Sequence, residues 1–115
     1  MDSELVYVNI TPATVQPGQV RVATYEGWRY AVCNVEGTYH VVDDTCTHDD
    51  GPLGEGKLDG CAIVCPRHGA RFDVRDGKVL SMPAAYPIRA YPTRVEAGQV
   101  QIGFTQPQLA RGSRR

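Results

Sequence analysis

Apolar and polar residues alternate with a period of two along most of the chain, which is the pattern of half-buried β-strands. Short runs rich in β-branched and aromatic residues show this alternation. The predicted strands are Leu5–Val8, Gln19–Ala23, Tyr30–Cys33, Tyr39–Val42, Cys61–Val64 and Val100–Phe104, with Val95 in a further one. No long stretch repeats apolar residues at helical spacing. The pattern therefore predicts an all-β fold, an antiparallel sandwich or barrel of roughly eight to ten short strands.

Glycine-containing pairs lie between these runs and predict tight chain reversals. They are Glu26-Gly27, Glu36-Gly37, Asp76-Gly77 and Ala97-Gly98. We expect Asp76-Gly77, flanked by Phe72–Val74 and Val79–Leu80, to be the clearest two-residue hairpin. The region from Asp43 to Gly60 breaks the alternation and indicates a long loop, which in a compact domain is usually functional or disordered.

The chain of 115 residues fits one domain, expected at residues 1–105. Residues 106–115, with three arginines, are predicted to be a flexible basic tail. No apolar run approaches the ~20 residues of a membrane span, and the first residues lack the features of a secretory signal. The sequence also lacks the basic, aromatic-interleaved face of a nucleic-acid binder. We expect a cytoplasmic protein that binds neither membrane nor nucleic acid.

Charge is unevenly distributed, although 12 basic and 13 acidic residues give a net charge of only −1. Between positions 43 and 59 the chain has one basic residue, Lys57. The acidic residues of this stretch are Asp43, Asp44, Asp49, Asp50, Glu55 and Asp59. The stretch is either a solvated acidic loop or part of a docking surface for basic partners.

Two cysteine–histidine units stand out in and after this loop. They are Cys46-Thr47-His48 and Cys65-Pro66-Arg67-His68, separated by 49–64. Three interpretations are open: buried cysteines without function, a structural Cys₂His₂ zinc site, and a 2Fe-2S cluster with two cysteines on one iron and two histidines on the other. Zinc fingers usually place both cysteines in one unit. The mixed order here favours the cluster, because each unit can give one ligand to each iron.

The two units and their spacer resemble the Rieske iron–sulfur signature. The resemblance extends over nearly the whole chain, through Ala70–Asp73, the Asp76-Gly77 turn, Ser81–Ala84 and the hairpin at Gly98. It implies a Rieske-type domain whose cluster-binding part, at about residues 43–84, consists of two ligand loops. A third loop, containing Pro83, would cover the cluster.

The resemblance also implies the ligand set and one Rieske-type 2Fe-2S cluster per chain. Cys46 and Cys65 would bind one iron, and His48 and His68 the other. Two neutral imidazoles in place of two thiolates make reduction easier, so Rieske potentials lie at roughly −150 to +300 mV. Respiratory Rieske proteins have a disulfide across the loops and two hydroxyl donors to the cluster. Here Asp50 or its neighbours and Arg67 stand at the cysteine positions, so that disulfide cannot form. Ala70 and Phe72 stand at the hydroxyl positions, which predicts a potential near the low end of that range.

A soluble one-electron carrier is the function that the resemblance implies. The chain is similar to the ferredoxin component of bacterial ring-hydroxylating dioxygenase systems. Its transient partners would be a flavin-dependent ferredoxin reductase and a terminal oxygenase, and it would be monomeric in isolation and not itself an enzyme. The alternatives are the small Rieske-like subunit of an assimilatory nitrite reductase and a zinc-stabilised interaction module. Metal content and colour would separate the last of these from the others.

The remaining cysteines and histidine are expected to be structural. Cys33 and Cys61 lie in apolar strand patterns and are predicted to be buried reduced thiols. A disulfide between them is disfavoured without a secretion signal. His40 lies in a strand and is interpreted as a structural or surface residue.

Overall fold

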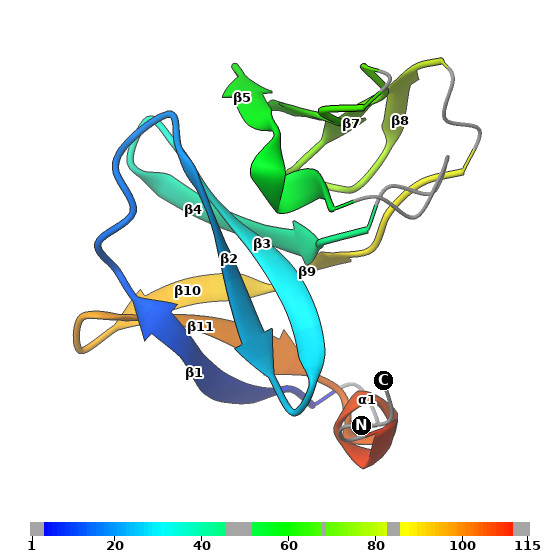
Figure 1. The fold of residues 1–115 in the computed structure, drawn as a ribbon. Coiled ribbons are helices and arrows are strands. Elements are labelled where there is room, and N and C mark those ends of the chain that lie inside the picture. Colours follow the sequence, from blue (N-terminus) through cyan, green and yellow to red (C-terminus); the bar gives the residue numbers. More distant parts are fainter. Residues whose placement is uncertain (1–3, 46–51, 68, 83–85, 112–115) are drawn as a thin grey trace.

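The part of the chain that the structure describes forms three antiparallel sheets (Figure 1). The computed structural model describes residues 4–45, 52–67, 69–82 and 86–111. The sheet orders are β1-β11-β10, β2-β3-β4-β9 and β5-β6-β7-β8. The predicted all-β fold is confirmed. The described residues form eleven strands, slightly more than expected, because the predicted loop between 43 and 60 contains one of them.

The first two sheets form what we call the basal part. Its strands are β1 (Val6–Pro12), β2 (Val20–Tyr25), β3 (Trp28–Val35), β4 (Thr38–Asp43), β9 (Ala90–Tyr91), β10 (Thr93–Glu96) and β11 (Gln99–Phe104). β1 pairs with β11, so the two ends of the domain meet in one sheet.

The third sheet and a short 3₁₀ helix form what we call the hairpin module. Its elements are η1 (Leu53–Glu55), β5 (Lys57–Asp59), β6 (Ala62–Val64), β7 (Arg71–Asp73) and β8 (Val79–Ser81). η1 and β5 lie inside the stretch 43–60, so the expectation of a continuous loop there was wrong. Figure 1 shows this module over the face of β3 and β4 that is turned away from β1 and β11.

The middle of β3 is buried on both faces of the central sheet, since successive residues of a strand point to opposite sides and both sides are covered. On β3, Tyr30 and Val32 contribute to the core shared with β11, whereas Ala31 and Cys33 contribute to the core shared with the hairpin module. The second core also contains Leu53, Ile63, Cys65, Ala70, Phe72 and Val74. The hairpin module, which lies within the predicted cluster-binding part at about residues 43–84, thus packs as one layer on the central sheet.

Three of the four predicted turns are two-residue hairpins. Both central residues have positive φ in Glu26-Gly27, Glu36-Gly37 and Ala97-Gly98, as type I′ turns require. The prediction for Asp76-Gly77 was wrong: residues 74–78 connect β7 to β8, and only Gly77 has positive φ. The Asp76 carboxylate accepts a hydrogen bond from the Lys78 amide at 3.0 Å instead, which is an Asx turn.

A short helix, α1 (Gln106–Arg111), occupies the start of the segment expected to be a flexible tail. Thr105 and Gln108 form a capping box. The Thr105 amide donates to the Gln108 side chain at 2.8 Å, and the Gln108 amide donates to the Thr105 hydroxyl at 3.3 Å. Leu109 packs against the basal core. Neither helical element of the described residues has the length and apolar character needed to cross a bilayer.

Candidate metal centre

Of the four predicted ligands, Cys65 lies within the described residues, whereas Cys46, His48 and His68 lie outside them. Pro83, expected in a covering loop, also lies outside. The structure therefore describes one ligand position and the chain on both sides of the other three. The convergence of the four side chains stays a prediction.

Cys65 follows β6 directly, at the root of the connection to β7. Its amide donates to the Ala70 carbonyl at 2.7 Å, and its carbonyl accepts from the Gly69 amide at 3.0 Å. Gly69 has a φ of +78°, which closes this tight loop. The thiol is in no disulfide, and the residue is 1% exposed. Two backbone hydrogen bonds thus hold the buried, reduced thiol of this predicted ligand in position.

The chain on either side of 46–51 is tied together at its base. Thr45 forms a β-bridge with Pro52, and the Leu53 amide donates to the Asp44 carbonyl at 3.3 Å. Gly54 permits this approach, since a Cβ there would meet the Asp44 carboxylate as well as the Val22 side chain. The first predicted ligand segment therefore leaves and re-enters the fold at one point.

The Asp44 carboxylate lies at the centre of this junction, which we call the base of the first ligand segment (residues 44–45 and 52–54). Its side chain is 1% exposed, and its Oδ2 lies 3.2 Å from Nε of Arg29 in an ion pair. Its Oδ1 accepts a hydrogen bond from the Gly54 amide. Oδ2 has no aligned hydrogen bond among the described residues. Burial raises the pKa of Asp44, although the Gly54 amide and Arg29 oppose this. Sequence reasoning missed Arg29 and the structural role of Asp44.

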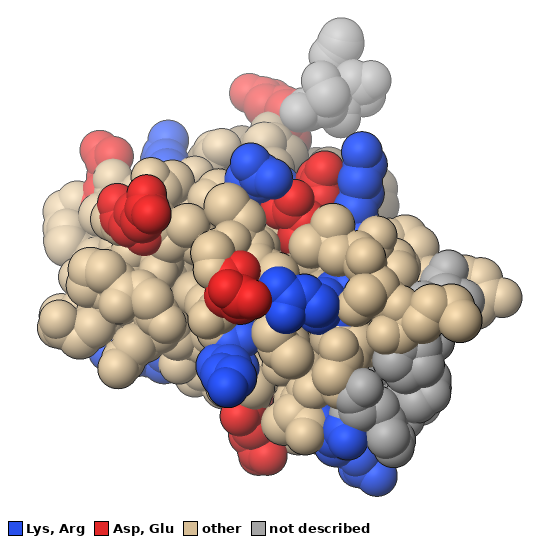
Figure 2. All heavy atoms as spheres, turned by 90° about the horizontal axis from the view of Figure 1, so that it is seen from above, with Lys and Arg blue, Asp and Glu red and all other residues tan. Residues whose placement is uncertain are grey.

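The acidic residues described in the stretch 43–59 differ in exposure, since Asp44 is buried and Asp43 partly buried, whereas Glu55 and Asp59 are exposed. Asp43 accepts a hydrogen bond from the Tyr91 hydroxyl at 2.6 Å, and Asp59 pairs with Arg71 at 2.7 Å. Asp49 and Asp50 lie outside the described residues. Figure 2 shows basic and acidic side chains interspersed on the upper face of the molecule. Whether this stretch is part of a docking surface stays a prediction.

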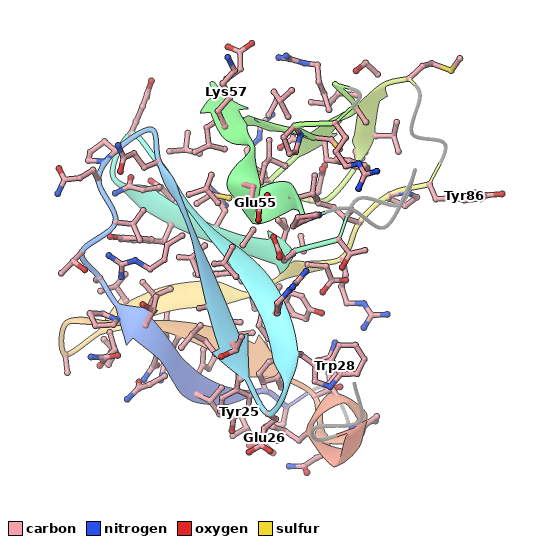
Figure 3. All side chains as sticks on the ribbon, in the orientation of Figure 1. Tyr25, Glu26, Trp28, Glu55, Lys57 and Tyr86 are labelled. Atoms are coloured by element: carbon pink, nitrogen blue, oxygen red, sulfur yellow. The ribbon has the colours of Figure 1, made fainter. Side chains whose placement is uncertain are left out.

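A hollow of about 370 Å³ lies beside Cys65. The residues around it come from both sides of the predicted centre: Glu55, Gly56, Lys57, Val64, Cys65, Pro66 and Gly69. Gly56 lets the two segments meet, because a Cβ there would clash with the Val64 carbonyl. Figure 3 shows Glu55 and Lys57 on the hairpin module. The donor chemistry and the paired backbones of the described residues fit a metal cluster with a thiolate ligand from Cys65.

The other two cysteines differ from each other. Cys33 is fully buried, and burial raises the pKa of its thiol to about 12. Cys61 is partly exposed, in the turn before β6, so the expectation that it is buried was wrong. Neither forms a disulfide. Burial and then Arg75 lower the pKa of His40, and Asp73 opposes this. No group of metal-binding side chains outside the predicted centre was found in the described residues.

Large apolar side chains are exposed at the edge of the hairpin module. Leu80, Met82 and Tyr86 are 49%, 82% and 70% exposed, and they flank residues 83–85. Tyr86 projects outward from the connection between β8 and β9 (Figure 3). Sequence analysis did not single out these three residues, because each belongs to an otherwise ordinary strand or loop pattern.

Comparison with known proteins gives a consistent result. Residues 6–92 match the Rieske 2Fe-2S domain. The biphenyl dioxygenase ferredoxin subunit of Pseudomonas sp. (strain KKS102) is 36% identical over 96 residues, which is 83% of this chain and 88% of that protein. The Sphingomonas yanoikuyae B1 ferredoxin has a TM-score of 0.81 and 34% identity, covering 86% of this chain and 99% of that one.

Two further solved structures bear on partners and alternatives. A ferredoxin in the complex of reduced oxygenase and oxidized ferredoxin in carbazole 1,9a-dioxygenase has a TM-score of 0.78 and 34% identity, covering 84% of this chain and 92% of that one. The putative NADH-dependent nitrite reductase small subunit from Mycobacterium tuberculosis has a TM-score of 0.77, covering 88% of this chain and 96% of that one, but only 20% identity. The second likeness shows the fold alone. With a matching domain over most of its length and ferredoxins of dioxygenase systems among its relatives, the chain belongs to the Rieske 2Fe-2S family.

Proposed function

We propose that this chain is a one-electron carrier between a flavin-dependent ferredoxin reductase and the terminal Rieske-type oxygenase of an aromatic-ring dioxygenase system. Cys46 and Cys65 are assigned to one iron of the 2Fe-2S cluster, and His48 and His68 to the other. The bound cluster supplies one reversible electron. The chain's own contribution is to hold the ligands, exclude water from Cys65 and present a surface to each partner.

The observation that supports this function best is the agreement in extent with free-standing ferredoxins. The alignment covers 86% of this chain and 99% of the Sphingomonas ferredoxin. The described residues form one basal part and one hairpin module. A carrier that works by encounter needs only such a scaffold.

We assign partner contact to the exposed apolar side chains Leu80, Met82 and Tyr86. They flank residues 83–85, the segment that the family resemblance places over the cluster. Short-lived complexes have small interfaces, and the buried centre of an interface is usually apolar, so a small apolar patch suits such a complex. Met82→Ser should slow electron transfer to the oxygenase, whereas Val95→Ser, at a 46% exposed position on β10, should not. Equal rates for both variants would refute this assignment.

The potential is proposed to lie near the low end of the Rieske range. Ala70 and Phe72 are both 0% exposed and have no hydroxyl to donate toward a cluster sulfur. Fewer donors leave the reduced, more negative cluster less stabilised. Protein-film voltammetry measures this directly. A midpoint potential in the upper part of the range would refute the argument.

The deciding experiment is low-temperature EPR of anaerobically purified, dithionite-reduced protein, with iron, sulfide and zinc assayed on the same sample. A rhombic signal with an average g below that of all-cysteine clusters, with two irons per chain, is expected. A colourless, EPR-silent protein with one zinc would leave the interaction-module alternative. Stable co-purification with a sirohaem-containing subunit would instead favour the nitrite reductase alternative.

We also propose a cytoplasmic, monomeric state. Three described cysteines without a disulfide agree with a reducing compartment. Sedimentation equilibrium of the cluster-loaded protein tests the monomer. A mass twice that of the chain at micromolar concentration would contradict it.

A further inference from the structure

An aromatic pocket of about 180 Å³ lies at the end of the basal part, where β2 turns into β3 and α1 packs alongside. Its walls include four aromatic and two polar side chains: Tyr25, Trp28, Tyr30, Phe104, Glu26 and Gln108. Figure 3 shows Tyr25, Glu26 and Trp28 at the opposite end of the molecule from Glu55, Lys57 and Tyr86. The pocket is therefore separate from the predicted cluster.

The aromatic walls are held rigidly by the core behind them. Tyr30 and Phe104 are 1% and 2% exposed. The rings of Tyr25 and Phe104 stack with centroids 5.8 Å apart, and Tyr30 lies 6.0 Å from Phe104. Tyr25 and Trp28 are only partly buried and line the open side. Because Tyr25 and Phe104 stack on each other and Tyr30 is buried, the accessible aromatic surface of this small space comes mainly from Tyr25 and Trp28, and aromatic rings of this kind can bind cations.

A carboxylate lies at the same pocket. Glu26 is exposed in the β2–β3 turn, where its φ of 53° is that of a type I′ turn. Gln108 is held on the opposite wall by the capping box with Thr105. An anion would be repelled by Glu26, and an apolar ligand would gain nothing from it. A cation gains both the carboxylate and the aromatic faces.

Size restricts the cation further. A pocket of about 180 Å³ is below the ~300–1,000 Å³ of sites that enclose a metabolite, but suits the head of one side chain. The planar guanidinium group stacks on aromatic rings and also pairs with carboxylates. The same contact occurs elsewhere in the molecule, where the guanidinium carbon of Arg94 lies 4.0 Å from the Tyr7 ring centre.

We propose that this pocket binds the guanidinium group of an arginine side chain from a protein partner. The site goes beyond the electron-carrier function and does not depend on it. A partner held here leaves the hairpin module uncovered. The chain could then be anchored at one end while its other end exchanges electrons.

The test uses the full-length, cluster-loaded protein and N-acetyl-arginine amide as probe. Trp28 is the only tryptophan, so its indole NMR signal reports on the pocket. Saturable shifts are expected at Trp28 and residues 25–30, with a dissociation constant on the order of 1 mM. The citrulline amide, which has the same shape without the charge, should bind at least about tenfold more weakly. Equal binding of the two amides would overturn the proposal.

Matched variants separate the pocket from general surface charge. Glu26→Gln should weaken binding about threefold, and Tyr25→Leu about fivefold because it keeps apolar volume but removes a π face. Glu36→Gln is the control, since Glu36 is exposed in the β3–β4 turn with nearly the same φ, 52°, and should change nothing. An equal effect of Glu26→Gln and Glu36→Gln would contradict a built site.

Two other occupants are outcomes of the same titration. Tighter binding of tetramethylammonium than of the arginine amide would assign the pocket to a small organic cation. A chain ending at residue 111 that binds the probe more than about tenfold better would assign it to the chain's own C-terminal arginines. Either result overturns a partner's arginine as the ligand, as does the absence of any saturable shift.

Discussion

The basal part and the hairpin module both consist of antiparallel strands, yet different interactions stabilise them. In the basal part, β1, β2, β3, β4 and β11 each have six to eight residues. Two-residue turns connect the strands of three of its hairpins, β2–β3, β3–β4 and β10–β11, and set the register of each pair. In the hairpin module each strand has three residues. Strands this short do not pair stably in isolation.

The module is held by contact with the basal part and by close backbone approaches. Its buried side chains share one core with Ala31, Cys33 and Val42 of the basal part. Gly56 and Gly77 each lie against a carbonyl oxygen that a Cβ would displace. The long strands of the basal part thus supply most of the stability, whereas the short strands of the hairpin module leave room for loops that can present ligands.

The largest effect is expected at the two buried cysteines, one in each part of the shared core. Cys65→Ser should abolish cluster binding, because a sulfur ligand is lost from the ligand loop. Cys33→Ser should leave the cluster intact and lower only stability. Iron and sulfide analysis with visible absorbance of both variants measures this. A cluster-free Cys33→Ser protein that is still folded by circular dichroism would mean that the ligand assignment is wrong.

Two turn glycines with the same backbone conformation compare the two parts directly. Gly77 and Gly98 have φ of +82° and +78°. Gly98→Ala should cost about 1–2 kcal/mol for the left-handed conformation alone. Gly77→Ala should cost about 1–3 kcal/mol more, because the new Cβ meets the Ile88 carbonyl. Urea denaturation of both variants gives the difference. Equal losses would mean that the close approach adds nothing.

Asp44 and Asp59 test the base of the first ligand segment. Asp44→Ala removes a buried acceptor from the Gly54 amide and should cost about 1–3 kcal/mol. Arg29, whose side chain is 54% exposed, can be rehydrated and limits this cost. Asp59→Ala breaks an exposed ion pair with Arg71 and should cost about 0–1 kcal/mol. Asp44→Ala should also release iron faster than wild type in a chelator assay. Unchanged release would mean that the contacts of Asp44 do not help to retain the cluster.

The smallest effect concerns the contact between β4 and the module. Burial and Arg75 lower the pKa of His40 below its ordinary value of 6.5, so the unfolded chain binds this proton more readily. The free energy of unfolding should therefore fall as pH drops through 6.5. His40→Gln should remove this part of the slope between about pH 7.5 and 5.5. A variant with the wild-type slope would show that His40 does not contribute.

The basal part was predictable because its information is local. Alternation in Tyr39–Val42 or Val100–Phe104 indicates a strand without knowledge of its partner, and Glu36-Gly37 indicates its turn. The helix α1 also had a local signal, the Thr105-x-x-Gln108 capping box, which the prediction of a flexible tail overlooked. What sequence alone did not indicate is that β3 is buried on both faces, since that depends on a second layer packed across it.

The hairpin module and the base of the site were less predictable because their contacts are distant or specific to the backbone. Asp76-Gly77 has the composition of a two-residue turn, but its backbone is committed elsewhere, since the Gly77 carbonyl accepts from the Ile88 amide at 3.0 Å. Asp44 looked like one acid among six, and only the fold places Arg29 and Gly54 around it. The spacing of the cysteine–histidine units indicated the chemistry. Cys65 is buried and in no disulfide, as a thiolate ligand requires, and the ligand roles of all four residues stay predictions.

The pairing of β1 with β11 has a consequence for how the protein is made. Asn9 lies opposite Gln101 in the ladder, 92 residues later in the chain. At roughly 5–20 residues per second, a ribosome makes the first strand on the order of 5–20 s before its partner exists. The neighbouring hairpins close locally in microseconds by comparison. The sheet that joins β1 to β11 can therefore form only after all four strands of the hairpin module have been synthesised.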